Sequence, residues 1–181
     1  MRVITGTARG RRLETLSGDD VRPTTDKVKE SVFSIIQFQI QDRMFLDLFA
    51  GSGQMGIEAL SRGAKGAYFL DLRREAAAVI RKNLSATGLA DKAEVRCADS
   101  LMFLRSAPVK FDVAFVDPPY NKGLAKKALE DLPSVMNKSG VIVVETATEE
   151  ELPESAGDFL LDRTYRYGKI KVTTYRCPLE D

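Results

Sequence analysis

The sequence predicts an α/β fold in which a doubly wound, mostly parallel sheet is covered by helices on both faces. Strand-like apolar runs and amphipathic helix-like segments alternate between residues 44 and 145, as in successive βαβ units. The central runs are continuously apolar, which is typical of strands buried on both faces of a sheet. Residues 159–167 and 169–176 alternate instead, with one glycine between them, and we expect an antiparallel hairpin there.

The first 21 residues are expected to form a short basic arm or hairpin, ahead of a Rossmann-like core over residues 22–181 in a single domain. Four arginines precede the first acidic residue: Arg2, Arg9, Arg11 and Arg12. A second basic group lies near the C-terminus: Arg163, Arg166, Lys169, Lys171 and Arg176. These groups form either two solvated surfaces or one face that contacts phosphates.

The elements of the core follow in order. Thr25 is the expected N-cap of a helix from about Asp26 to Ile40. The expected strands are residues 44–49, 66–71, 93–96, 111–116 and 140–145. Four helices are expected between these strands. The first ends near Ser61 and the second near Gly88, the third covers 101–105, and the fourth covers 124–132, with one more turn as far as Met136. Pro133 should end or bend the last of these helices.

Composition excludes several kinds of chemistry. The chain of 181 residues has no histidine and two cysteines, Cys97 and Cys177. Triads that use histidine are therefore excluded, and two isolated cysteines cannot complete a zinc site. The chain has few cysteines, no apolar run as long as a membrane span and no apolar leader at its N-terminus. These features predict a cytoplasmic protein.

The first candidate site is the segment DLFAGSGQMG, which places Gly51 and Gly53 in a turn between a buried strand and a helix. Such a turn lets backbone N–H groups approach a ligand. Asp71 ends the next strand, where a carboxylate can accept both ribose hydroxyls of an adenosine. The spacing also fits a nicotinamide or flavin cofactor. Asp47 repels a pyrophosphate and suits the ammonium of a methionine moiety, or it merely braces the turn.

After the third strand, Asp99 could accept the 6-amino group of adenine, while the N–H of Ala98 or Ser100 donates to the ring. Asp99 is also the expected N-cap of the short helix that follows. The two roles are compatible.

The most specific motif is DPPY, residues 117–120, which directly follows the fourth strand. An exocyclic amino group of a base is a poor nucleophile because its lone pair is delocalised into the ring. The Asp117 carboxylate and the Pro118 carbonyl can hold its two hydrogens, and two prolines stiffen this arrangement. Tyr120 can stack on an unpaired or flipped base.

The glycine turn, the spaced carboxylates and DPPY together resemble a class I methyltransferase that acts on amino groups. The segments RVITGTARGRRL, RPTTDKVKE and DLFAGSGQMGIEALSRGA are similar to the RsmD family, over most of the chain. The resemblance implies S-adenosylmethionine as the methyl donor. It implies N2 of a guanine in 16S ribosomal RNA as the target.

The resemblance also assigns roles to residues. It implies that the donor site is lined by Gly51, Gly53, Asp71 and Asp99, to which Asp47 and Ala98 are added by the reasoning above. Asp117, Pro118 and Tyr120 would face the guanine, and the segment from Arg22 to Thr24 would close over the methionine end of the donor. Two positions depart from the family pattern: Leu72-Arg73-Arg74 after the ribose acid, and Gln54-Met55 in the glycine turn.

The expected partner is 16S ribosomal RNA, or the assembling small subunit, bound by a monomer that needs no metal and no membrane. We expect RNA phosphates to contact Arg9, Arg11, Arg12, Lys122 and Lys126. Three rivals stay open: a DNA or other RNA methyltransferase acting on adenine N6 or cytosine N4, a nucleotide-dependent oxidoreductase, and a non-catalytic RNA-binding module. Little sequence outside the core is left for the target-recognition domain of a DNA enzyme.

Overall fold

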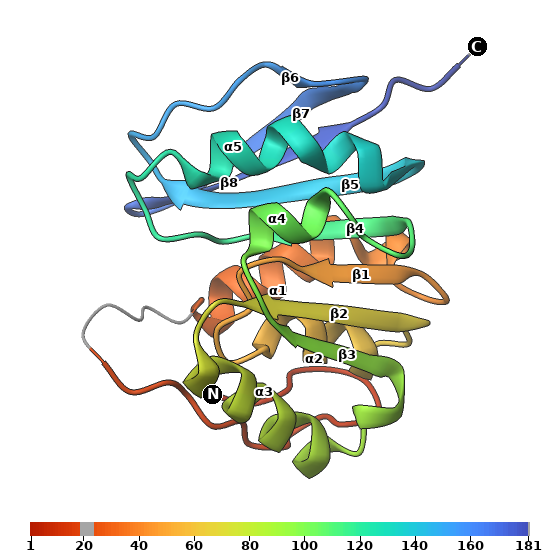
Figure 1. The fold of residues 1–181 in the computed structure, drawn as a ribbon, viewed down its shortest axis with the longest axis vertical. Helices are drawn as coiled ribbons and strands as arrows, with labels where there is room; N and C mark the ends of the chain where they lie inside the picture. The colour runs from red at the N-terminus through yellow and green to blue at the C-terminus, as the bar shows by residue number, and fades with distance from the viewer. Residues whose placement is uncertain (19–23, 181) are drawn as a thin grey trace.

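The computed structural model describes residues 1–18 and 24–180, and that part of the chain is built around one sheet of eight strands. The strands are β1 (Met44–Asp47), β2 (Gly66–Asp71), β3 (Ala93–Cys97), β4 (Phe111–Val116), β5 (Met136–Ala147), β6 (Ser155–Ala156), β7 (Phe159–Tyr167) and β8 (Ile170–Arg176). They lie in the order β3-β2-β1-β4-β5-β8-β7-β6 (Figure 1). The first five strands pair in parallel and the last three pair antiparallel, which confirms the expected fold class.

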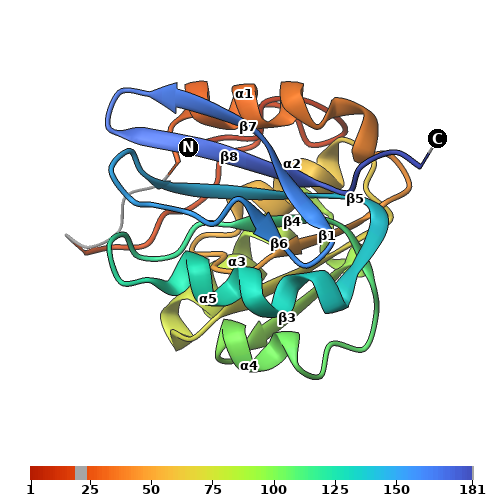
Figure 2. The ribbon, with the colours of Figure 1, turned by 90° about the horizontal axis from the view of Figure 1, so that it is seen from above.

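Helices cover both faces of the sheet, and each face has its own apolar core. One face carries α1 (Asp26–Ile35), α2 (Gln54–Ser61) and α3 (Arg74–Thr87), and the other carries α4 (Ser100–Leu104) and α5 (Leu124–Asp131). Figure 2 shows α1 and α5 on opposite sides of the strands. Three short 3-10 helices, η1 (Gln37–Gln39), η2 (Ala90–Lys92) and η3 (Leu132–Val135), complete the helical elements.

The order of the strands reverses between β1 and β4. From β1 the chain moves outward through β2 to β3, whereas β4 returns to the other side of β1 and is followed by β5. In open α/β sheets a crevice forms at such a reversal, just beyond the carboxyl ends of the strands. This edge, called the carboxyl edge below, is therefore where a ligand is expected.

Several predicted boundaries are wrong, two of them by four residues or more. The first helix ends at Ile35, not at Ile40, and a 3-10 turn follows. Ile36 and Ile40 are nevertheless both buried, so the apolar periodicity continues where the α-helix does not. The fifth strand begins at Met136 rather than Gly140, and its pairing with β4 shifts register in this added part. Residues 137–139 are exposed, and the apolar pattern of a buried strand therefore gave no sign of them.

The N-terminal arm forms a hairpin that packs on α2. Arg2 and Arg12 pair in an antiparallel bridge, and the side chains of Val3, Ala8 and Leu13 are buried in the core. At the turn, Gly6 has a φ of +94°, and a Cβ there would lie 1.9 Å from the carbonyl oxygen of Ser61. Glycine is therefore required for this contact.

A buried carboxylate holds the arm in place. Glu58 of α2 accepts hydrogen bonds from the backbone N–H groups of Ile4 (2.8 Å) and Thr5 (3.2 Å). Lys29, fully buried on α1, lies 3.9 Å from Glu58 and donates to the carbonyl of Arg2 at 2.8 Å. The turn of the hairpin thus lies against the last residue of α2, at the edge opposite the carboxyl edge.

Candidate active site

Four neighbouring strands each bring a carboxylate to the carboxyl edge. Asp47 ends β1, Asp71 ends β2, Asp117 directly follows β4, and Glu145 lies near the end of β5. The residue two positions before each carboxylate packs in the core beneath α1, α2 and α3: Phe45, Phe69, Phe115 and Val143. Because side chains alternate between the faces of a strand, the four carboxylates lie on that same face.

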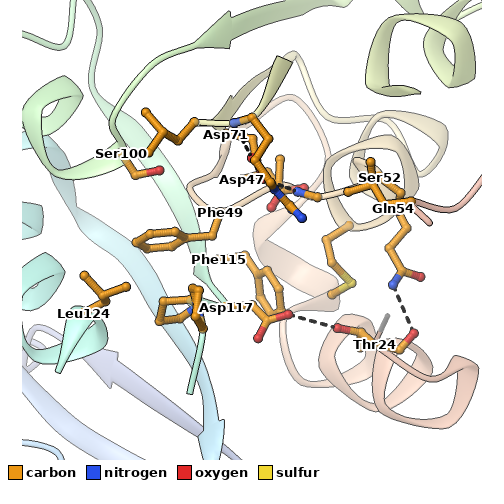
Figure 3. A pocket seen from close by; sticks show the side chains of 18 of the residues that line it. Thr24, Asp47, Phe49, Ser52, Gln54, Asp71, Ser100, Phe115, Asp117 and Leu124 are labelled. Carbon is orange, nitrogen blue, oxygen red and sulfur yellow. Dashed lines mark hydrogen bonds and ion pairs between the residues drawn. The ribbon is translucent and has the colours of Figure 1, made fainter. Parts of the chain in front are cut away.

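A pocket of about 790 Å³ is lined by three of these carboxylates, Asp47, Asp71 and Asp117, while Glu145 lies beside Asp117. The glycine turn forms one part of its wall, and the DPPY loop forms another. Apolar side chains from both sides of the strand reversal complete the lining, among them Phe49, Leu101, Phe115 and Leu124 (Figure 3). The structure therefore brings the two motifs singled out in the sequence to one cavity.

The glycine turn is held by two of the carboxylates. Gly51 (φ +58°) donates its N–H to Asp71 Oδ2 at 3.0 Å, and a Cβ at Gly51 would meet nothing within 4 Å. Asp47 Oδ2 accepts from the N–H of Gly56 in the first turn of α2, also at 3.0 Å. Asp47 is buried, and burial raises the pKa of its carboxyl to about 8. Asp47 therefore braces the turn while it also lines the pocket.

The carboxylate of Asp71 has a second partner that the sequence did not reveal. Arg73 approaches it with its backbone N–H at 3.0 Å, its Nε at 3.2 Å and one terminal nitrogen at 3.3 Å. Arg73 is one of the residues at which the sequence departs from the family pattern. A ligand that uses both oxygens of Asp71 must share them with this guanidinium.

Of the two residues expected to contact adenine, Asp99 is among the described residues that line the pocket and Ala98 is not. Asp99 caps α4, accepting from the N–H of Met102 at 3.0 Å, and it also lines the pocket. The N–H of Ala98 donates to the Asp71 carbonyl at 3.0 Å. In this arrangement Ser100 is the better placed of the two expected backbone donors, because the Ala98 N–H is already bonded.

Beside the DPPY loop, Thr24 and Glu145 form a polar cluster with Asp117 and Tyr120. The Thr24 hydroxyl lies 3.0 Å from Glu145 Oε2 and 3.5 Å from Asp117 Oδ2. The Tyr120 hydroxyl donates to Glu145 Oε1 at 3.1 Å. Burial, reinforced by the nearby Glu145 and Asp47 carboxylates, raises the pKa of Asp117 well above its usual value. Burial also raises the pKa of Glu145, against the hydrogen bonds from Thr24 and Tyr120.

Two of the residues in this region were missed by reasoning from the sequence alone. Glu145 ends the run GVIVVE at the edge where ligands bind, and that position was the available signal. Gln54 is buried at the start of α2 and donates from Nε2 to the Thr24 carbonyl at 3.0 Å (Figure 3). Its Oε1 is also buried and has no hydrogen-bond partner among residues 1–18 and 24–180. Its signal was the departure from small residues in the turn.

Comparison with known proteins identifies the family. The family model described as "Conserved hypothetical protein 95" matches residues 1–176. The chain is 36% identical over 179 residues to the ribosomal RNA small subunit methyltransferase D of Escherichia coli, covering 97% of this chain and 89% of that protein. The chain belongs to the RsmD family. The resemblance noted in the sequence is thereby confirmed.

Other RsmD-family relatives agree over the same length. The protein YlbH of Bacillus subtilis is 40% identical over 181 residues, covering 97% of this chain and 98% of YlbH. The solved structure of yhhF from Escherichia coli superposes with a TM-score of 0.87 at 35% identity, covering 98% of this chain and 97% of that one. The structural agreement therefore extends over the arm, the core and the C-terminal hairpin.

The basic residues proposed for RNA lie in different places on this RsmD-family fold. Lys122 lines the pocket, and Lys126 is exposed on α5. The exposed arginines of the arm, Arg9, Arg11 and Arg12, are on the hairpin and are not brought to the pocket. Arg22 lies outside the described residues. In residues 1–18 and 24–180, no helix is both long and apolar enough to cross a membrane.

Proposed function

We propose that this RsmD-family chain transfers a methyl group from S-adenosylmethionine to N2 of a guanine in 16S ribosomal RNA. The observation that carries the proposal is that the DPPY loop and the glycine turn open into one pocket. Membership of the family supports the assignment, because a relative covered over 89% of its length is named a ribosomal RNA small subunit methyltransferase.

The residues of the pocket fit the donor in three respects. Asp71 offers an acceptor for ribose hydroxyls, and Gly51 leaves open space where a side chain would intrude. Asp47 offers an acceptor for the ammonium of a methionine end. The bound donor would supply an electrophilic methyl group on a sulfonium.

The DPPY loop supplies what the acceptor needs. The 2-amino group of guanine requires hydrogen-bond acceptors in order to become a nucleophile. Asp117 and the carbonyl of Pro118 are the acceptors that we assign. When the new N–C bond has formed and the bond from the methyl carbon to the sulfonium sulfur has broken, leaving a neutral thioether, the amine carries one surplus proton. Asp117 is the nearest group of the loop that can take it, and the raised pKa of its carboxyl favours this transfer.

Tyr120 is assigned the contact with the base. Its ring lines the pocket, and its hydroxyl is held by Glu145. A ring fixed at one end gives a flat surface on which a flipped base can stack. Lys122, at the same pocket, is placed to meet a phosphate beside the target nucleotide.

The test is methyl transfer from labelled S-adenosylmethionine to 16S RNA and, separately, to isolated small subunits, followed by mass spectrometry of the nucleosides. We expect N2-methylguanosine, and turnover that survives a metal chelator. Asp117→Asn should lower kcat by about 100- to 1,000-fold, the usual effect of removing one oriented electrostatic group. Calorimetry should show unchanged binding of S-adenosylhomocysteine.

The matched control is Asp91→Asn, which removes a carboxylate from the exposed turn η2, directly before β3 and so at the edge of the sheet opposite the carboxyl edge. It should leave both turnover and binding unchanged. N6-methyladenosine or N4-methylcytidine as the product would replace the guanine assignment. An Asp117→Asn enzyme with unchanged turnover would contradict the mechanism.

A further inference from the structure

Glu145 is a buried carboxylate for which the proposed reaction has no use so far. Its exposed fraction is 1%, and it lies near the end of β5, beside Asp117. The pairing of β4 with β5 explains this position, because Val116 and Val144 are in register and the next residues are Asp117 and Glu145. Burying a carboxylate is costly unless its environment compensates, so a buried glutamate beside Asp117 calls for a role.

The hydrogen bonds of Glu145 join β5 to two other segments of the active site. Its Oε1 accepts from Tyr120 of the DPPY loop, and its Oε2 accepts from Thr24, just before α1. A threonine hydroxyl has one hydrogen, which Thr24 shares between Glu145 Oε2 (3.0 Å) and Asp117 Oδ2 (3.5 Å), with the shorter contact to Glu145. Figure 3 shows the Thr24 side chain directed at Asp117, and the amide of Gln54 directed at Thr24 from another side.

We propose that Glu145 is a positioning residue of the methyl transfer, which holds the Tyr120 ring directly and the Asp117 carboxylate through the Thr24 hydroxyl. This inference rests on the proposed function and adds a residue to it. Glu145 thus fixes the relative position of two groups: the Tyr120 ring, on which the base stacks, and the Asp117 carboxylate, which accepts from the amino group. Its negative charge also favours the protonated form of Asp117, which then gains a proton more readily from the methylated amine.

The groups that act on this pair can be enumerated for the described residues. Asp117 is affected by Glu145 and Asp47, both of which favour its protonated form, and by the Thr24 hydrogen bond, which favours the ionised form. Glu145 is affected by the hydrogen bonds from Thr24 and Tyr120. Its partner in the register with β8 is Val172, which carries no charge.

The arrangement predicts opposite shifts in the pH dependence of kcat for two variants. Asp117 must be ionised to accept the amino hydrogens, so its protonation sets the acid limb of the profile. Glu145→Gln removes a like charge and should move the acid limb to lower pH. Thr24→Val removes a hydrogen bond to the ionised form and should move the acid limb to higher pH.

The magnitude of kcat distinguishes the positioning role of Glu145 from the effect of its charge. Glu145→Asp keeps the charge but shortens the side chain, so it should leave the limb in place and lower kcat by about 100-fold, the effect of misplacing a reacting group by about 1 Å. Thr24→Ser keeps the hydroxyl, so its acid limb should lie at the wild-type pH and not at the higher pH expected for Thr24→Val. Glu94→Gln, on the exposed edge strand β3, is the charge-matched control and should change nothing.

The experiment measures kcat against pH at saturating S-adenosylmethionine and RNA, with folding checked by thermal unfolding. Opposite shifts of the acid limb in Glu145→Gln and Thr24→Val support the proposal. Unshifted limbs in a folded Thr24→Val enzyme overturn it, and so does a folded Glu145→Gln enzyme that keeps the wild-type limb. If the wild-type enzyme methylates no RNA, the proposed function fails and this inference fails with it.

Discussion

Asp47 offers the sharpest test of how the site is built, because it is a buried acid that both braces the glycine turn and lines the donor pocket. Its side chain is 1% exposed, and it accepts a hydrogen bond from the N–H of Gly56. Asp47→Asn keeps the shape of the side chain and an oxygen for this bond. It removes the ability to ionise.

The expected change in stability follows from the shift in pKa. Burial raises the pKa of Asp47 from 3.8 to about 8. Between these two values the folded protein holds a proton that the unfolded chain has released, so its free energy of unfolding falls as the pH rises. pH 7 lies about three units above the pKa of 3.8 in the unfolded chain, so keeping this carboxyl protonated in the folded protein costs about 4 kcal/mol of stability at pH 7. Asparagine avoids this cost, but burying its amide costs about 1–3 kcal/mol. The variant should therefore be about 1–3 kcal/mol more stable at pH 7.

The assay is urea unfolding of both proteins from pH 5 to pH 9, with calorimetry of S-adenosylhomocysteine binding. The stability of Asp47→Asn should depend less on pH than that of the wild type. Donor binding should weaken by about 10- to 100-fold, as expected for the loss of a hydrogen bond to a charged group. A variant that is less stable than the wild type at pH 8, with an unchanged pH dependence, would refute this reasoning.

Three further outcomes are expected. Glu58→Gln should lower the free energy of unfolding by about 3–5 kcal/mol, because it leaves the Lys29 ammonium buried beside a neutral group, and urea unfolding would measure this. Gly56→Ala places a methyl group 2.3 Å from the Phe69 ring and should cost about 1–3 kcal/mol, with part of the loss recovered when Phe69→Leu is added. Neutralising the three exposed arginines of the arm should raise the RNA KM and reduce the salt slope of binding by about 2–3, and an unchanged RNA affinity would exclude the arm from the RNA interface.

Much of the fold could be predicted because it depends on local patterns of apolar, capping and turn residues in the sequence. The strand at residues 111–116 and the helix that begins at Asp26 are found where apolar periodicity and the Thr25 cap placed them. The hairpin of residues 159–176 turns at Gly168, whose φ of +61° explains the glycine between its two halves. Each of these features depends on residues within a few positions of one another.

The boundaries that could not be predicted were decided by packing. Ile36 and Ile40 satisfy a helical apolar pattern, yet the chain enters a 3-10 turn that buries both. The exposed start of β5 carries no apolar signal, because only its pairing with β4 defines it as strand. Local propensity has little influence where tertiary contacts favour another backbone conformation.

The sequence by itself determined the nature of the site: a glycine turn, carboxylates at strand ends, and a DPPY loop that suits an amino group. Only the tertiary structure decided which partners these groups have. Thr24 meets Asp117 and Glu145 across 93 and 121 residues of chain, and Arg9, Arg11 and Arg12 of the arm do not line the pocket. Contacts between segments so far apart depend on strand order and register, which a single sequence does not display.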